Sequence, residues 1–263
     1  MLSYRHAFHA GNPADVFKHT VLVALVRALQ EKPRGIVFVD THAGPALIEL
    51  DRPEAQKNRE YERGIERIWR RPGADPFTTD YLARVGLHNP DGNLRRYPGS
   101  PQLIRDLLRS NDRAILCELH PAEQQALRER FASDRRVELR LGDGYQVMDK
   151  ALPPPGGRGL VLIDPPYERK EEWTDLTRAL KTALKRFAHG VYAIWYPVLG
   201  DHPAQLEQLP ARLSLTTDQW MDLRINFPPD QQLGRMTGCG MALINCPWRL
   251  RQPLRDWCNP PSE

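Results

Sequence analysis

The sequence predicts a doubly wound α/β fold, in which a mostly parallel sheet of seven strands has helices on both faces. Two observations predict it. Short apolar runs of strand length alternate with longer segments of helical periodicity along nearly the whole chain. Polar residues follow directly after several of these runs, where open α/β sheets bind their ligands. The length suits one large domain, and we expect residues 1–263 to form it.

The first predicted element is a buried helix near the amino terminus. Asn12 is a suitable N-cap, Pro13 suits the first helical position and Asp15 suits the first turn. The apolar spacing continues to about Gln30, and the second half of the segment is apolar nearly all round. We therefore expect a helix over residues 13–30 that packs against a large surface.

A first strand and an unusually long connection follow. Residues 35–40 form a short apolar run, and the turn after it keeps only Gly44 of the glycine-rich loop found in nucleotide-binding folds. About 70 residues separate Gly44 from the next apolar run, far more than one crossover needs. Helical spacing predicts a small helical insertion over residues 46–97. Its arginines either cover a solvated face or bind RNA phosphates, and they are Arg59, Arg63, Arg67, Arg70 and Arg71.

The rest of the chain alternates between strands and helices. Ser100 as N-cap and Pro101 at the first helical position predict a helix whose amino terminus would also favour a ligand's carboxylate. The stretch 227–240, with its prolines and glycines, predicts a mobile loop near the site. Strands are expected at residues 114–118, 137–141, 159–163, 191–196, 220–225 and 241–245. Helices are expected at residues 121–132, 145–152, 173–187 and 204–213.

Acidic residues stand at the ends of three of these strands. Glu118 ends the second core strand, where an acid in a dinucleotide-binding fold accepts hydrogen bonds from ribose hydroxyls. Asp143 and Gly144 end the third, although both residues are also ordinary turn formers. Asp164 ends the fourth strand and begins the sequence Asp-Pro-Pro-Tyr.

The residues from Asp164 onward predict a site that holds a planar base by its exocyclic amine. The carboxylate of Asp164 and the carbonyl of Pro165 can each accept one N–H, and two prolines restrict the backbone. Tyr167 supplies an aromatic face, and stacking contributes about 1–3 kcal/mol per base. Extruding a base from a helix costs a few kcal/mol, so stacking offsets much of that cost. The alternative is an acid that ends a strand before a simple Pro-Pro turn.

Composition narrows the class of protein. With 37 basic and 33 acidic residues, the net charge of +4 permits a polyanionic partner without proving one. We expect no membrane partner and no signal peptide, because the longest apolar run near the amino terminus is too short to span a bilayer and is followed by Arg27. The four cysteines form no C-x-x-C pair, so we expect reduced thiols in a cytoplasmic protein. We also expect no metal, because carboxylates and cysteines at ligand spacing are missing around His6, His9 and His19.

Motifs along nearly the whole chain resemble one family. The Asp-Pro-Pro-Tyr sequence looks like motif IV of the class I S-adenosylmethionine-dependent amino-methyltransferases that act on nucleic acid. The other motifs are Tyr4-Arg-His-Ala-Phe-His-Ala-Gly-Asn12, Asp40-Thr-His-Ala-Gly44, Tyr97-Pro-Gly-Ser-Pro101, Glu118-Leu-His-Pro121, Asp143-Gly144 and Trp195-Tyr-Pro197. Together they resemble the bacterial 23S ribosomal RNA adenine-N6 methyltransferase J family. The resemblance implies a Rossmann-like class I methyltransferase fold with S-adenosylmethionine as cofactor.

The resemblance also implies roles for individual residues. Asp164 is the implied catalytic acceptor, with Pro165 and Tyr167 beside it, and Tyr4 and Lys18 are assigned to the substrate RNA. The chain departs from the expected pattern after Gly44, where a more glycine-rich or polar continuation would be usual. The residues implied to bind the cofactor are His19, His42, Gly44, Ser100, Glu118, Asp143, Gly144 and Asp164.

The expected reaction is direct methyl transfer to the N6 amine of an adenosine in 23S ribosomal RNA, without a metal. Methylation of DNA adenine at N6 and of ribosomal RNA guanine at N2 remain open, because both are compatible with a motif IV of this type. A catalytically idle RNA-binding module on the same fold is the alternative from another class. We expect the chain to act as a monomer.

Overall fold

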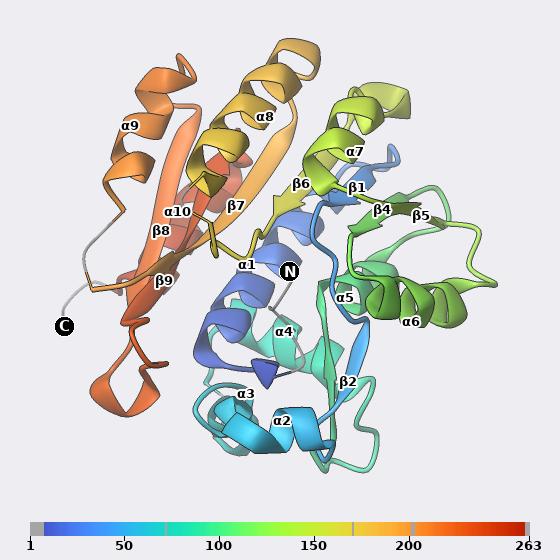
Figure 1. The fold of residues 1–263 in the computed structure, drawn as a ribbon, viewed down its shortest axis with the longest axis vertical. Helices are drawn as coiled ribbons and strands as arrows, with labels where there is room; N and C mark the ends of the chain where they lie inside the picture. Colours follow the sequence, from blue (N-terminus) through green and yellow to red (C-terminus); the bar gives the residue numbers. More distant parts are fainter. Residues whose placement is uncertain (1–7, 72, 170, 201–202, 261–263) are drawn as a thin grey trace.

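A seven-stranded sheet with helices on both faces forms the centre of the molecule (Figure 1). The computed structural model describes residues 8–71, 73–169, 171–200 and 203–260. The strands of this sheet are β1 (Val37–Asp40), β4 (Arg113–Glu118), β5 (Val137–Leu141), β6 (Gly159–Ile163), β7 (Val191–Val198), β8 (Trp220–Asn226) and β9 (Gly238–Ile244). Their order is β5-β4-β1-β6-β7-β9-β8. The neighbouring pairs β5-β4, β4-β1, β1-β6 and β6-β7 are parallel. Strand β9 is antiparallel to both its neighbours, β7 and β8, and this mostly parallel arrangement confirms the predicted sheet.

The helices connect these strands and pack on the two faces of the sheet (Figure 1). Their bounds confirm the predicted helices to within a few residues, and one carboxyl-terminal helix was not predicted. They are α1 (Pro13–Gln30), α5 (Ser100–Leu107), α6 (Pro121–Phe131), α7 (Gly144–Ala151), α8 (Glu172–Arg186), α9 (Ala204–Arg212) and α10 (Trp248–Cys258).

The central strands are buried on both sides because they carry a continuous apolar run. Successive side chains of a strand point to opposite faces. Phe38 of β1 therefore packs in the core cluster that contains residues of α1 and α5, whereas Val37 and Val39 pack in the cluster that contains residues of α7 and α8. All five residues of β6 are buried. The sheet thus has two cores, one under each layer of helices.

Helix α1 forms as the capping residues predict. The side chain of Asn12 accepts a hydrogen bond from the backbone N–H of Asp15 at 2.9 Å, and Pro13 occupies the first turn. The helix packs against α4, α5 and α10 and is almost entirely buried as far as Val26. Burial extends to its polar residues Lys18 and His19, which places charged and hydrogen-bonding groups inside the molecule.

The unpredicted helix α10 packs on α1 and β8. Pro253 lies inside it, and a proline in a helix interior removes one backbone hydrogen bond and usually marks a break. Burial of Leu250 and Leu254 in the core stabilises the helix in spite of that loss. Sequence periodicity therefore missed α10, because tertiary packing outweighs the local preference here.

Between β1 and α5 the chain forms a segment of short elements. These are β2 (Leu47–Glu49), α2 (Pro53–Asn58), the 3-10 turn η2 (Glu60–Glu62), α3 (Ile65–Arg70), α4 (Pro76–Gly86) and β3 (Arg96–Pro98). Strands β2 and β3 pair antiparallel and bring the two ends of the segment together. The backbone N–H of Ile65 donates to Gly11 O at 2.8 Å, which docks α3 on the turn before α1. That residues 46–97 form a separate subdomain stays a prediction.

The order of the strands places several polar residues at one edge of the sheet. Strand β1 lies between β4 and β6, so the chain winds outward in opposite directions on its two sides. Ligands of open α/β sheets bind at such a switch point, outside the carboxyl ends of the strands. Asp40 and Glu118 end β1 and β4, and Asp164 follows β6 directly.

Candidate active site

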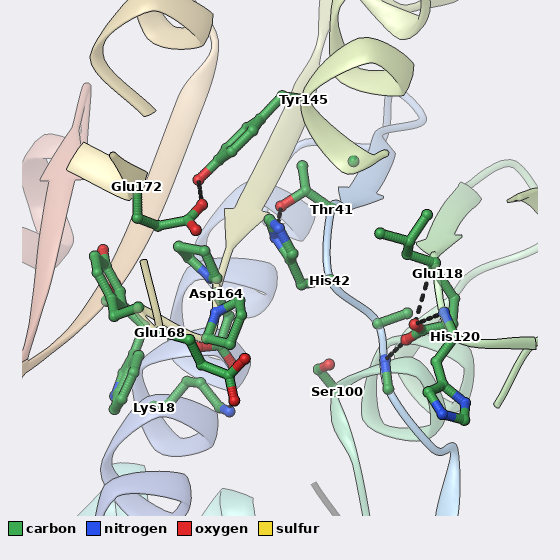
Figure 2. Close-up of a pocket in the computed structure, with 18 of the residues that line it drawn as sticks. Lys18, Thr41, His42, Ser100, Glu118, His120, Tyr145, Asp164, Glu168 and Glu172 are labelled. Carbon is green, nitrogen blue, oxygen red and sulfur yellow. Dashed lines mark hydrogen bonds and ion pairs between the residues drawn. The ribbon is translucent and has the colours of Figure 1, made fainter. Parts of the chain in front are cut away.

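A cavity of about 1040 Å³ opens at the carboxyl ends of the central strands (Figure 2). Every predicted site residue that the structure describes lines this one cavity. They are Lys18, His19, His42, Gly44, Ser100, Glu118, Asp143, Gly144, Asp164, Pro165 and Tyr167. Tyr4, which we assigned to the substrate RNA, lies outside the described residues. The sequence therefore predicted correctly which of these residues come together, and their individual roles remain predictions.

The carboxylate of Glu118 is held in place by backbone N–H groups (Figure 2). Gly44 donates to Oε2 at 2.7 Å, while Leu119 and His120 each donate to Oε1 at 2.7 Å. Gly44 adopts a φ of 63°, a left-handed conformation that glycine adopts without strain. The glycine turn and the acid thus form one unit, and Oε2, which accepts a single N–H, keeps acceptor capacity for a hydroxyl group.

Asp143 and Gly144 connect β5 to α7. Oδ1 of Asp143 accepts hydrogen bonds from the backbone N–H groups of Tyr145 at 2.9 Å and Gln146 at 3.2 Å, so Asp143 is the N-cap of the helix. A Cβ atom on Gly144 would lie 1.9 Å from the carbonyl oxygen of Thr41. Gly144 therefore lets the start of α7 approach the loop after β1. Both residues have a structural function beside the predicted cofactor contact.

Ser100 does not cap its helix, so the sequence prediction was wrong on this point. The N-cap is Gly99, and Ser100 is the first residue of α5. Its hydroxyl donates instead to Oδ2 of Asp40 at 2.7 Å. A Cβ atom on Gly99 would lie 2.3 Å from the carbonyl oxygen of Pro45, so close packing of this turn requires glycine at the cap.

Asp40 lies behind the cavity wall and supports two of the residues that line it, His42 and Ser100. The sequence analysis did not single it out, although it opens the motif that contains His42 and Gly44. Its side chain is fully buried and also accepts a hydrogen bond from the backbone N–H of His42 at 3.3 Å. Burial raises the pKa of Asp40 to about 7, and the nearby negative charge of Asp164 acts in the same direction. The signal in the sequence was an acid at the end of the first strand.

The two predicted histidines are both fixed by neighbours. Nδ1 of His19 hydrogen-bonds the hydroxyl of Tyr97 at 2.7 Å, so this buried imidazole faces the insertion side of the cavity. His42 hydrogen-bonds Thr41 Oγ1 through Nδ1 at 2.8 Å and meets the ring of Tyr145 edge to face. Burial lowers the pKa of His42, which favours the neutral imidazole.

Lys18 has a partner that its assignment to RNA did not anticipate. Its Nζ donates to Oδ2 of Asp164 at 2.6 Å and lies 2.9 Å from Oδ1 of Asp15. Lys18 is only 4% exposed, so its ammonium does not present itself to an RNA phosphate on the surface. The side chain of Asp164 is 17% exposed and lines the cavity, so the ion pair does not remove its carboxylate from the site.

An aromatic group completes the wall beside Asp164. The backbone of Tyr167 has a φ of 50°, which is uncommon for a bulky residue and marks a constrained turn. Its hydroxyl donates to the carbonyl oxygen of Trp195 at 2.8 Å. Its ring lies 5.0 Å from that of Trp173 and 6.1 Å from that of Trp195, measured between centroids. Tyr167 is therefore fixed at both ends, and the sequence analysis did not predict its two tryptophan neighbours.

The described part of the chain has neither a metal-binding cluster nor a helix suited to a membrane. No group of three or more histidine, cysteine or carboxylate side chains is placed there to hold a metal ion. None of the helices described has the length and apolar character that crossing a membrane requires.

Comparison with known proteins identifies the family. A family model described as "Ribosomal RNA large subunit methyltransferase D, RlmJ" matches residues 33–259. The chain belongs to this family. Ribosomal RNA large subunit methyltransferase J of Escherichia coli is 40% identical over 257 residues, which cover 97% of this chain and 91% of that protein. The protein of the same name from Haemophilus influenzae is 40% identical over 258 residues, with the same coverage.

A solved structure has the same fold as this member of the RlmJ family. The crystal structure of a protein from Legionella pneumophila superposes with a TM-score of 0.81 at 34% identity, covering 97% of this chain and 96% of the other. Family membership confirms the resemblance that the motifs suggested, and the strand order is that of the class I methyltransferase fold.

Proposed function

We propose that this chain transfers a methyl group from S-adenosylmethionine to the N6 amine of an adenosine in 23S ribosomal RNA. Membership of the RlmJ family makes the chain a ribosomal RNA large subunit methyltransferase. The observation that carries the finer proposal is the position of Asp164. It follows β6 directly, begins the Asp-Pro-Pro-Tyr turn and lines a cavity that also contains Glu118.

The residues of the cavity fit this cofactor. Its volume of about 1040 Å³ lies at the upper end of ordinary ligand pockets, roughly 300–1,000 Å³, so it has room for the cofactor and a base together. Glu118 is held by three backbone N–H groups, and its Oε2 can still accept a hydrogen bond from a ribose hydroxyl. When bound, the cofactor supplies a methyl group made electrophilic by its sulfonium. We assign Glu118 to the ribose, with His19, His42 and Ser100 toward the rest of the cofactor.

The base is assigned to the other part of the cavity. Asp164 and the carbonyl of Pro165 accept the two N–H groups of the adenine amine, and Tyr167 supplies a stacking face. Because Oδ2 of Asp164 is bound by Lys18, we assign Oδ1 to the amine. In the transfer, the bond from the amine nitrogen to the methyl carbon would form as the carbon–sulfur bond of the cofactor breaks and leaves a neutral thioether. Oδ1 of Asp164 would accept the proton that the nitrogen loses.

The proposal is tested by identifying the methylated product. Ribosomal RNA stripped of protein, taken from a strain that lacks the enzyme, is incubated with the purified chain and labelled S-adenosylmethionine. Digestion to nucleosides followed by mass spectrometry is expected to show N6-methyladenosine. Methylguanosine, or label in DNA under the same conditions, would contradict the proposed substrate. If calorimetry detected no binding of S-adenosylmethionine, the chain would be an idle RNA-binding module instead.

Two further expectations concern the state of the protein. We propose that it acts as a monomer in the cytoplasm. Light scattering during size-exclusion chromatography tests the first, and fractionation of cells tests the second. A dimer at micromolar concentration would contradict the first expectation.

A further inference from the structure

The loop between β8 and β9 forms one side of the cavity mouth. Residues 227–237 connect the two strands, and the base of this loop is firmly closed. The backbone N–H of Phe227 donates to the carbonyl oxygen of Thr237 at 2.8 Å, and that of Thr237 donates to Val198 O at 2.9 Å. Phe227 itself is buried in the core. The base of the loop therefore belongs to the rigid sheet.

The far end of the loop turns back toward the catalytic residues. The backbones of Leu233 and Met236 exchange two hydrogen bonds, of 3.1 and 3.0 Å, around a tight turn. Gly234 takes the left-handed conformation that this turn requires, with a φ of 58°, and Arg235 is exposed beside it. Leu233 and Met236 line the same cavity as Asp164. The turn thus presents two apolar side chains to the cavity and one cation to the solvent.

Two arginines of the insertion hold the middle of this loop. Nη1 of Arg67, in α3, donates to Oδ2 of Asp230 at 2.5 Å. Nη1 of Arg63, just before α3, donates to the carbonyl oxygen of Gln232 at 2.8 Å. In Figure 1 the loop lies below β8 and β9, at the end of the molecule where α3 also lies. Segments more than 160 residues apart in sequence are therefore joined next to the cavity.

The ion pair between Arg67 and Asp230 is too exposed to contribute much to the free energy of folding. The two side chains are 49% and 62% exposed, and pairs of this kind contribute little to folding. An unpaired carboxylate at this position would repel the phosphates of an approaching RNA strand. Pairing with Arg67 neutralises Asp230 and fixes the direction in which the loop points.

We propose that the Arg67–Asp230 pair positions the 227–237 loop for RNA, so that Leu233 and Met236 contact the bases that flank the extruded adenosine. The proposal rests on the proposed function. The ligand of this surface is the strand of RNA beside the target nucleotide. Base faces pack on apolar side chains, and Arg235 is placed for a backbone phosphate. Arg67 and Asp230 are positioning residues, because they act through the loop and touch neither the amine nor the cofactor.

The test is a charge exchange. The variants are Arg67→Asp, Asp230→Arg and the double variant that carries both changes, with Arg70→Asp as a matched control. Arg70 lies in the same helix and pairs with Glu66 of that helix, so its replacement changes the same charge without touching the loop. The measurements are KM and kcat on stripped ribosomal RNA, the Kd for S-adenosylmethionine, and hydrogen exchange of residues 228–237.

The two single variants are expected to raise KM for RNA about fivefold, with kcat and the cofactor Kd little changed. Their loop amides should exchange faster, and the double variant should restore both KM and exchange. Asp230→Arg alone is decisive. If Arg67 and Asp230 acted on RNA only through their own charges, this variant would lower KM instead of raising it.

Other outcomes overturn the proposal in distinguishable ways. Unchanged hydrogen exchange in both single variants would show that the pair does not hold the loop. Faster exchange with unchanged KM would show that the loop position does not matter for RNA. If Arg70→Asp raised KM as much as Arg67→Asp, the rise would come from the net charge of this surface and not from the position of the loop. Failure of the wild-type protein to methylate ribosomal RNA would contradict the proposed function itself, while the exchange data would still decide whether the pair holds the loop.

Discussion

Nζ of Lys18 and Oδ2 of Asp164 lie 2.6 Å apart, although the two residues are separated by 146 positions in the chain. The contact joins the buried face of α1 to the residue that follows β6. One oxygen of the proposed proton acceptor is therefore fixed by a cation inside the molecule. The amino-terminal helix is part of the active site as well as part of the core.

Asp164→Asn should slow methyl transfer strongly while the protein stays folded. The amide oxygen can still accept an N–H from the base, but the side chain can no longer take the proton from the amine. We expect turnover to fall by a factor of about 10²–10⁴, with the Kd for the cofactor changed much less. Asp149→Asn, at a half-exposed carboxylate on the rim of the cavity, is the control. Turnover of Asp164→Asn near that of the control would refute the assignment.

Lys18→Met should lower both stability and turnover. The change removes a buried cation and leaves Asp15 and Asp164 without it, and breaking a buried ion pair by removing one partner costs about 3–5 kcal/mol. Denaturant titration measures the loss of unfolding free energy, and turnover is measured on the fraction that remains folded. Arg27→Met, which breaks a pair with Asp80 near the surface at the other end of α1, should cost about 1 kcal/mol or less. Equal costs for the two variants would show that Lys18 does not carry a buried charge.

Asp40→Asn should change the dependence of stability on pH. Because the pKa of Asp40 is raised in the folded state to about 7, the folded protein binds a proton that the unfolded chain releases near pH 4. Stability from this group is complete below about pH 4 and is lost as pH rises through about 7. The variant cannot ionise at this position. As pH rises from 4 to 7, the unfolding free energy of the wild type should therefore fall relative to that of the variant. A difference that stays constant from pH 4 to 8 would contradict the pKa of Asp40.

Gly144→Ala should destabilise the start of α7. The added Cβ atom would lie 1.9 Å from the carbonyl oxygen of Thr41, so the helix or the loop after β1 must move. We expect a loss of about 1–3 kcal/mol of unfolding free energy and weaker binding of the cofactor, because Asp143 moves with the helix. The control is Gly86→Ala at the end of α4, where the new atom would meet only Trp69 at 3.8 Å. Equal stability of the two variants would argue against close packing at Gly144.

Much of the site could be predicted because its residues stand at positions that local patterns define. Glu118 and Asp164 each end an apolar run, and the carboxyl ends of parallel strands meet at one edge of a sheet. Asn12 and Pro13 start α1 through hydrogen bonds and backbone angles that depend only on near neighbours. The predictions that failed depend on contacts between residues far apart in the chain. Ser100 carries the side chain of an N-cap, but its hydroxyl is taken by Asp40, 60 residues away.

The sequence by itself determined the family, the alternation of strands and helices, and which side chains would line one cavity. Only the tertiary structure decided that Lys18 binds Asp164, that Asp40 is buried enough to change its pKa, and that Arg67 reaches Asp230. The physical reason is that a strand or a cap is specified by neighbours in the chain. The partner and the protonation of a charged group depend instead on distance and exclusion of water, which exist only once remote segments have packed together.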